Sequence, residues 1–177
     1  MHYTRKSKIF GIPKISKKFF RTIMKLAHQI KAKVFSYEKN NEDDKLVLDN
    51  FLQLFPFDLK EEKIKLDKTN ATGFGENRIT IFEVALEREK HTSQFIGNLI
   101  KNLNDEQKKL ILEQLDSRLD NELNFFLRFD KDEYLKNNKF ALTDSGNCFH
   151  IMISVAAFPR KREVALGVIR SILNIFN

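Results

Sequence analysis

The stretch Arg78–Glu87, RITIFEVALE, carries the clearest strand signal in the sequence. Its large apolar residues alternate with polar ones such as Glu83 and Glu87, which is typical of a strand with one buried face. An earlier segment, 62–69, alternates in the same way. The connector 70–77 contains Gly, Asn and Thr, so the two segments predict an antiparallel hairpin closed by a long loop.

Outward from this hairpin, apolar periodicity predicts seven further elements. They are a strand at 30–37, a helix from about 40 to 55, helices at 92–103 and 104–119, strands at 123–130 and 148–157, and a last helix entered at Phe158 and Pro159. The first central helix is expected to begin at Thr92 or Ser93. The second has a capping-box signal, Asn104 with Gln107 three positions later.

The predicted order is therefore β-α-β-β-α-α-β-β-α. Hairpins combined with helices that gather on one side indicate the α+β class, with a mainly antiparallel sheet and the helices packed on one face. A chain of 177 residues has room for one ordinary domain.

The net charge of +7 is unevenly distributed along the chain. The first 33 residues hold ten Lys or Arg and no acid, whereas the rest hold 21 Lys or Arg against 24 Asp or Glu and carry a net charge of −3. We therefore predict a basic N-terminal extension, residues 1–28, followed by one domain, residues 29–177. Three interpretations of the extension stay open: an arm that contacts nucleic acid, an inert disordered tail, or a segment upstream of a true start at Met24.

Composition disfavours several classes of protein. The single cysteine, Cys148, allows neither a disulfide framework nor a thiolate zinc site within the chain, and it suits a reducing compartment. The longest apolar runs are far shorter than the roughly 20 residues of a membrane span. The N-terminus lacks the apolar core of a secretory signal. These features predict a cytoplasmic protein without membrane association, and no cofactor is indicated.

Alternation also separates a helix-covered face of the sheet from an open face. In the last strand, Phe149, Ile151, Ile153 and Val155 are expected to face the helices. The opposite parity leaves a mixed open face, made of Lys65, Ile79, Ile81, Glu83, Ala85, Phe126, Arg128, Cys148, His150, Met152, Ser154 and Ala156. Such a face suits base stacking and phosphate contacts, and it also suits a dimer or partner interface.

Two basic positions outside the open face are further candidates for RNA contact. Arg160, Lys161 and Arg162 enter the last helix, whose first N–H groups are unpaired and attract anions. A phosphate there would relieve the unfavourable placement of cations at a helix N-terminus, and the alternative is a solvated helix start. Arg78 follows the glycine-containing loop, for which the alternative is an ordinary hairpin loop with Phe74 against the sheet.

No catalytic constellation is evident in the sequence. The histidines are scattered and none has metal-ligand spacing. Asp130, Asp132 and Glu133 could hold a magnesium ion, but acids in this position more often cap a short helix. The thiol of Cys148 has only His150, two residues later, as a nearby activating group. We therefore expect no enzyme activity and no metal site.

Four blocks of sequence carry a family likeness. They are LFPF at Leu54–Phe57, TGFGEN at Thr72–Asn77, LRFDK at Leu127–Lys131 and AAFPRKRE at Ala156–Glu163. Together they resemble, in order and spacing, the archaeal RNA-binding proteins described as predicted exosome subunits. The resemblance extends from about Met24 to the C-terminus.

The resemblance implies a fold like that of the 5S-rRNA-binding ribosomal protein of the large subunit, which is also likened to a double-stranded-RNA-binding domain. It implies RNA binding and a link to the exosome or to a ribosome-related complex. Its basic positions correspond here to Arg128, Lys131, Arg160, Lys161 and Arg162. The basic extension before Met24 is not expected from the family.

The sequence therefore predicts a non-catalytic RNA-binding protein that holds structured RNA by phosphate and 2′-OH contacts with little sequence readout. A role in RNA processing or degradation is part of this hypothesis. The alternative is a protein-interaction or homodimerisation module that uses the open sheet face without touching RNA.

Overall fold

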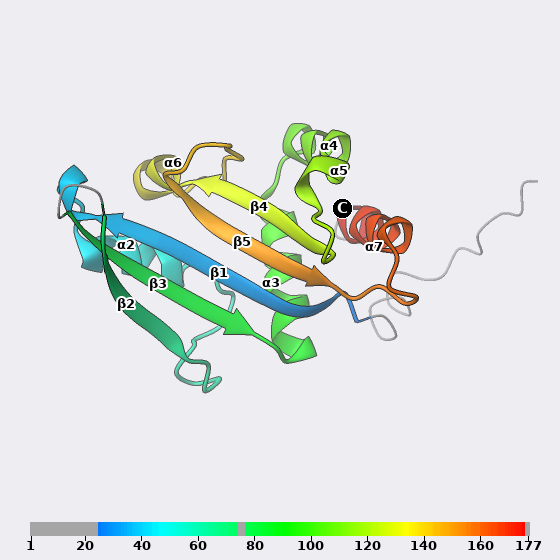
Figure 1. Ribbon diagram of the computed structural model, residues 1–177, viewed down its shortest axis with the longest axis horizontal. Coiled ribbons are helices and arrows are strands. Elements are labelled where there is room, and N and C mark those ends of the chain that lie inside the picture. The colour runs from blue at the N-terminus through cyan, green and yellow to red at the C-terminus, as the bar shows by residue number, and fades with distance from the viewer. Residues whose placement is uncertain (1–24, 74–76, 176–177) are drawn as a thin grey trace, which may run out of the picture.

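The computed structural model describes residues 25–73 and 77–175 (Figure 1). Five strands form one antiparallel sheet in the order β2-β3-β1-β5-β4. They are β1 (Ala27–Tyr37), β2 (Leu66–Thr72), β3 (Arg78–Leu86), β4 (Asn124–Asp130) and β5 (Cys148–Val155). The central strand is therefore the first strand in the sequence.

The described residues also form six α-helices and a short 3-10 helix, η1 (Glu38–Asn40). The α-helices are α2 (Asp44–Leu52), α3 (Glu89–Asn102), α4 (Asp105–Glu113), α5 (Leu115–Arg118), α6 (Lys131–Asn137) and α7 (Arg162–Ile175). Helices α2 and α3 contact β1, α7 contacts β5, and α5 and α6 contact β4. Figure 1 shows the sheet in front of α2 and α3, with its other face open.

Phenylalanine rings fill the layer between the sheet and the helices. Phe51 of α2 stacks on Phe149 of β5, with ring centroids 6.2 Å apart. Phe55 and Phe95 extend this cluster toward α3, with their centroids 5.1 Å apart. All four rings are buried. Because phenylalanine has no polar atom that needs a partner, it fills this layer without a desolvation cost.

The predicted α+β class, with an antiparallel sheet and helices on one face, is confirmed. The hairpin loop is shorter than expected, because the β2–β3 ladder continues to the pair Thr72 and Arg78. A helix, α6, occupies most of a polar stretch in which no full element was predicted.

The structure shows where α3 and α4 begin, so the caps predicted for these two helices can be compared with it. The capping box of Asn104 and Gln107 is confirmed, since each side chain accepts the other residue's backbone N–H. The predicted start of the preceding helix at Thr92 or Ser93 is wrong. Thr92 is fully buried inside α3, and its hydroxyl donates to the carbonyl of Glu89 in the preceding turn.

Residues 1–24 of the expected basic extension lie outside the described residues, and so does Phe74 of the hairpin loop. In the part of the chain that is described, no helix combines the length and the apolar character needed to cross a membrane.

A buried ion pair joins two distant segments of the chain, residues 35–42 and the start of α6. The ammonium of Lys131, at the start of α6, lies 2.7 Å from the carboxylate of Glu42 and donates at 2.7 Å to the carbonyl of Phe35. The same carboxylate accepts the backbone N–H of Tyr37 at 2.9 Å. The side chain of Lys131 is only 1% exposed, so this contact fixes the end of β1 against α6.

We expect Lys131→Met to lower the free energy of unfolding by about 3–5 kcal/mol, because it leaves the Glu42 carboxylate without its buried partner. Urea denaturation followed by circular dichroism measures this loss. The double variant Lys131→Met, Glu42→Gln removes both charges and should recover part of it. A loss below about 1 kcal/mol in the single variant would contradict the role given to this pair.

Candidate nucleic-acid interface

The strand registers align charged side chains in a row across the open face. Arg128 of β4 pairs with His150 of β5, which pairs with Lys33 of β1. Lys33 pairs in turn with Glu83 of β3, and Glu83 pairs with Asp67 of β2. Paired residues of adjacent strands point to the same side of the sheet. The positive side chains therefore lie toward β4 and the negative ones toward β2.

A second row lies beside the first and is more apolar. Phe126 of β4 pairs with Met152 of β5, and Met152 pairs with Lys31 of β1. Phe126 is 38% exposed, which is unusual for a ring on a strand in this protein. The two rows line a hollow of about 270 Å³. We name it the basic hollow, after the three cations among its lining residues, which are Lys31, Lys33, Phe35, Glu83, Phe126, Leu127, Arg128, His150, Ile151 and Met152.

Two acids of the open face are already neutralised within the chain. Glu83 forms an ion pair with Lys33 at 2.7 Å, and Asp67 forms one with Lys65 at 2.5 Å. Lys31 and Arg128 take part in no ion pair or hydrogen bond of their side chains among the described residues. The basic hollow thus presents two uncompensated cations, which favours an anionic ligand.

His150 lies between the two cationic side chains of its row. Burial, followed by repulsion from Arg128 and Lys33, lowers the pKa of His150 below its ordinary value of 6.5. Its ring therefore stays neutral near pH 7, and it contacts Phe35 edge to face with centroids 5.6 Å apart. At this pH His150 contributes an aromatic surface rather than a third charge.

The open-face parity predicted for β3, β4 and β5 agrees with the structure, but the contribution of β1 was missed. Lys31, Lys33, Phe35 and Tyr37 occupy the open face of the central strand. The alternation of apolar residues had identified this strand. The alternate residues of the same strand are two lysines followed by two aromatic residues. This pattern was the signal that could have predicted the contribution of β1 to the open face.

Arg162, one residue of the expected anion site at the start of α7, makes structural contacts instead. The guanidinium of Arg162 donates to the carbonyls of Asp116 and Leu119 at 2.5 and 3.0 Å, and it lies 3.4 Å from the Asp116 carboxylate. These contacts satisfy carbonyls at and just after the end of α5. Arg162 is therefore a clamp between α5 and α7.

The two preceding cations are more accessible. Arg160 pairs with Glu122 at 3.0 Å, yet its side chain is 70% exposed. Lys161 is exposed and forms no ion pair in the described part of the chain. Both lie just beyond β5, at the end of the sheet opposite to the start of β3, so they are not neighbours of Arg78 (Figure 1).

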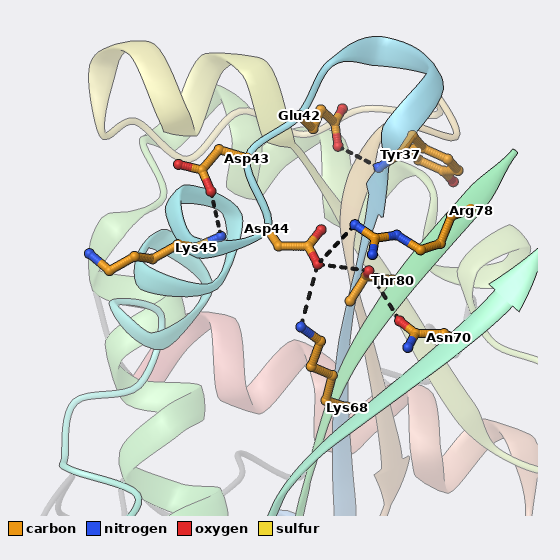
Figure 2. A network of polar contacts seen from close by, with 9 residues as sticks. All are labelled: Tyr37, Glu42, Asp43, Asp44, Lys45, Lys68, Asn70, Arg78 and Thr80. Atoms are coloured by element: carbon orange, nitrogen blue, oxygen red, sulfur yellow. Dashed lines mark hydrogen bonds and ion pairs between the residues drawn. The ribbon is translucent and has the colours of Figure 1, made fainter.

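Arg78 lies on the helix side of the sheet, at the parity of buried Thr80. Its guanidinium is 4.0 Å from the carboxylate of Asp44, in the first turn of α2 (Figure 2). Burial alone would raise the pKa of Asp44, but side-chain hydrogen bonds, among them those from Thr80 and Lys68, outweigh burial and hold this pKa below its ordinary value. The network ties α2 to the β2–β3 edge.

The structure corrects the expectation that Lys131 contacts RNA. Its ammonium is enclosed by Glu42, the Phe35 carbonyl and the ring of Tyr37, whose centroid is 5.1 Å away. A phosphate would have to replace this buried ion pair, so we leave Lys131 out of the interface. Lys131 instead positions Phe35 and Tyr37, which lie on the open face.

Groups that could carry catalysis are engaged in structural contacts. Asp130 caps α6 by accepting the N–H of Glu133 at 2.9 Å. The thiol of Cys148 lies 3.3 Å from the Nε2 atom of His150, and burial raises the pKa of this thiol. Within residues 25–73 and 77–175, no group of three or more His, Cys, Asp or Glu could hold a metal ion.

Comparisons with known proteins bear on what this chain is similar to. The sequence model of a family described as RNA binding matches residues 29–156. The RNA-binding protein PAB1135 of Pyrococcus abyssi is 27% identical over 145 residues, which cover 81% of this chain and 92% of that protein.

Solved structures share the fold. The DUF54 protein Mth689 of Methanothermobacter thermautotrophicus is 26% identical with a TM-score of 0.64, and the match covers 84% of this chain and 98% of that one. AF2318 of Archaeoglobus fulgidus, matched to DUF54, is 23% identical with a TM-score of 0.72, and the match covers 82% and 99% of the two chains. The likeness to AF2318 concerns the fold alone.

We expect Arg162→Ala to lower the free energy of unfolding by about 1–3 kcal/mol, because it leaves carbonyls of the α5–β4 segment without their donor. Arg170→Ala, at an exposed position of the same helix, is the matched control and should change stability by less than about 0.5 kcal/mol. Urea denaturation measures both. Equal effects of the two substitutions would show that the clamp is not structural.

The lowered pKa of His150 makes stability depend on pH. The unfolded chain takes up this proton more readily, so the stability is fully present above about pH 6.5 and falls as the pH drops toward the pKa of the folded state. His150→Gln should flatten this decline between pH 7 and 5, as measured by urea denaturation. His28→Gln, at an exposed position, should leave the slope unchanged. An unaltered slope in His150→Gln would contradict the prediction.

Proposed function

We propose, given that the chain belongs to the protein family described as RNA binding, that it is a non-catalytic protein that holds structured RNA through the basic hollow. The contacts are to phosphates and 2′-hydroxyl groups. RNA helices are recognised mostly by shape and by such contacts, because their deep major groove is closed to side chains. The interface therefore needs correctly placed cations rather than a large positive charge.

The observation that carries this proposal is the uncompensated charge of Lys31 and Arg128 on a face where Glu83 and Asp67 are already paired. Lys31 is half-buried and lies beside Met152, where bulk solvent screens its charge less than at a fully exposed site. Arg128 is exposed at the rim of the same hollow. A phosphate backbone laid across β1, β5 and β4 would meet both.

The same face could bind a second copy of the chain, and its exposed Phe126 suits such a contact. A dimer interface would bury Lys31 and Arg128, however. Glu83 and Asp67 of the second copy already have partners, so they would not neutralise these two cations. Burying unpaired charge is costly. We therefore favour RNA as the occupant of this face.

A role in RNA processing or degradation, within an exosome-linked or ribosome-related complex, belongs to the same proposal and rests on the family resemblance. The accessible cations Arg160 and Lys161 provide a second phosphate contact at the far end of the sheet. We assign no described residue to a protein partner in such a complex.

We expect Arg128→Gln and Lys31→Gln each to weaken the binding of a fluorescent RNA hairpin, and to lower the slope of log affinity against log salt by about 0.7 to 0.9 per lost phosphate contact. Fluorescence anisotropy over a series of salt concentrations measures both quantities. Arg170→Gln and Lys109→Gln, at exposed positions of α7 and α4, are the matched controls and should leave the slope unchanged.

Hairpin binding that is independent of salt, or equally weakened by the controls, would count against this interface. Size-exclusion chromatography of Ile81→Lys, Phe126→Lys tests the alternative. A wild-type dimer that this double variant dissociates, with no RNA bound by either protein, would instead identify a homodimerisation face.

A further inference from the structure

A second hollow, of about 290 Å³, is lined by residues at the end of β1 and the start of β3. Figure 1 shows these two strand ends at the same end of the sheet. The hollow is lined by Tyr37, Lys39, Asn40, Gly73, Asn77, Arg78, Ile79, Gly146 and Asn147. We call it the Tyr37 hollow. Its volume is close to the lower end of the range of small-molecule sites.

The lining combines the groups that recognise a nucleotide. Tyr37 contributes an aromatic ring, Lys39 contributes a positive charge, and three asparagines contribute amide groups. Arg78 also lines the hollow, with its guanidinium 4.0 Å from the Asp44 carboxylate. None of the described lining residues is acidic. Lys39 is exposed and forms no ion pair among the described residues, so its ammonium is available to a phosphate.

The ring of Tyr37 is held in place before any ligand arrives. The backbone N–H of Tyr37 donates to Glu42 at 2.9 Å, and the ammonium of Lys131 lies 5.1 Å from its ring centroid. Because the buried ion pair fixes both neighbours, the ring loses little freedom when a base stacks on it. Preorganisation of this kind strengthens binding.

Two stacked rings connect this hollow to the basic hollow. Phe35 lines the basic hollow and Tyr37 lines the second one. The two rings stack with centroids 6.1 Å apart and an interplanar angle of 22°. They occupy alternate positions of β1 and therefore share the open face. A strand of RNA that leaves the basic hollow along β1 would pass Phe35 and reach Tyr37.

We propose that the Tyr37 hollow receives an unpaired nucleotide of the RNA held on the basic hollow, with its base against Tyr37 and its phosphate near Lys39. This inference rests on the proposed function. It specifies the substrate class: a structured RNA with a single-stranded extension or bulge beside its helix. The carboxylates of an acidic peptide would pair with the cations but would not stack on the ring. A nucleotide offers both a phosphate and a base, so it is the better fit.

Gly146 offers a way to fill the hollow without disturbing the fold. A Cβ atom placed on Gly146 would meet no atom within 4 Å, so a larger side chain projects into open space. Gly167, on α7, has equally open surroundings and provides a matched control away from the hollow. The pair Gly146→Leu and Gly167→Leu therefore differs in where the new side chain lies.

The test uses the full chain with two RNAs, a blunt hairpin and the same hairpin with a three-nucleotide 3′ extension, measured by fluorescence anisotropy. The extension should raise wild-type affinity by roughly 5- to 150-fold, the range of base stacking on one aromatic side chain. Gly146→Leu should remove this gain while keeping the affinity for the blunt hairpin. Gly167→Leu should keep both values.

Two further variants check the contacts directly. Tyr37→Leu should lose the gain from the extension and Tyr37→Phe should retain it, because the ring and not the hydroxyl carries the stacking. Lys39→Gln, at an exposed position, should reduce the gain and its dependence on salt without altering thermal unfolding.

The outcomes separate this inference from the proposed function. Failure of both RNAs to bind would overturn the proposed function. Binding of the hairpin without a gain from the extension, or a gain that survives in Gly146→Leu, would overturn only the inference. Competition by free adenosine monophosphate as strong as that by the extended hairpin would make the hollow a mononucleotide site, which also overturns it.

Discussion

Burial of one face of β1 is the constraint on which the rest of the structure depends. This strand is hydrogen-bonded on both sides, to β3 and to β5, and Ile30, Ala32 and Val34 are fully buried beneath the helices. Side chains alternate along a strand, so these three residues decide which others face outward. A slip of one residue would bury Lys31 and Lys33. The register that builds the core therefore also builds the open face.

The polar contacts at the edges of the sheet fix the position of this face. The Lys131–Glu42 pair anchors the end of β1, and the Asp44 network anchors α2 to the β2–β3 edge (Figure 2). Lys131 lies 5.1 Å from the ring centroid of Tyr37, and Arg78 of the Asp44 network lines the Tyr37 hollow. Charged residues near the proposed RNA surface thus divide into those that hold the scaffold and those that remain available. The available ones are fewer than the sequence suggests.

Local patterns were enough to predict the fold class, the Asn104 capping box and the face on which Phe126 and Arg128 lie. They were not enough to predict what each cation contacts. Lys131 meets Glu42, which is 89 residues away in sequence, and Arg162 meets Asp116, which is 46 residues away. Both contact groups that only the tertiary fold brings near. Periodicity reports which side of a strand a residue occupies, and it carries no information about such partners.

The charge balance explains why the open face needs more than phosphate contacts. From Met24 onward the chain has 24 Lys or Arg and 24 Asp or Glu, so bulk attraction to RNA is absent from this part of the molecule. Lys31, Arg128, Arg160 and Lys161 could supply only a few phosphate contacts, and each contributes a term that salt weakens. Stacking on an aromatic ring does not depend on counterion release. A ring held rigidly beside the cations therefore adds affinity that salt does not remove, and the Phe35–Tyr37 pair occupies that place on β1.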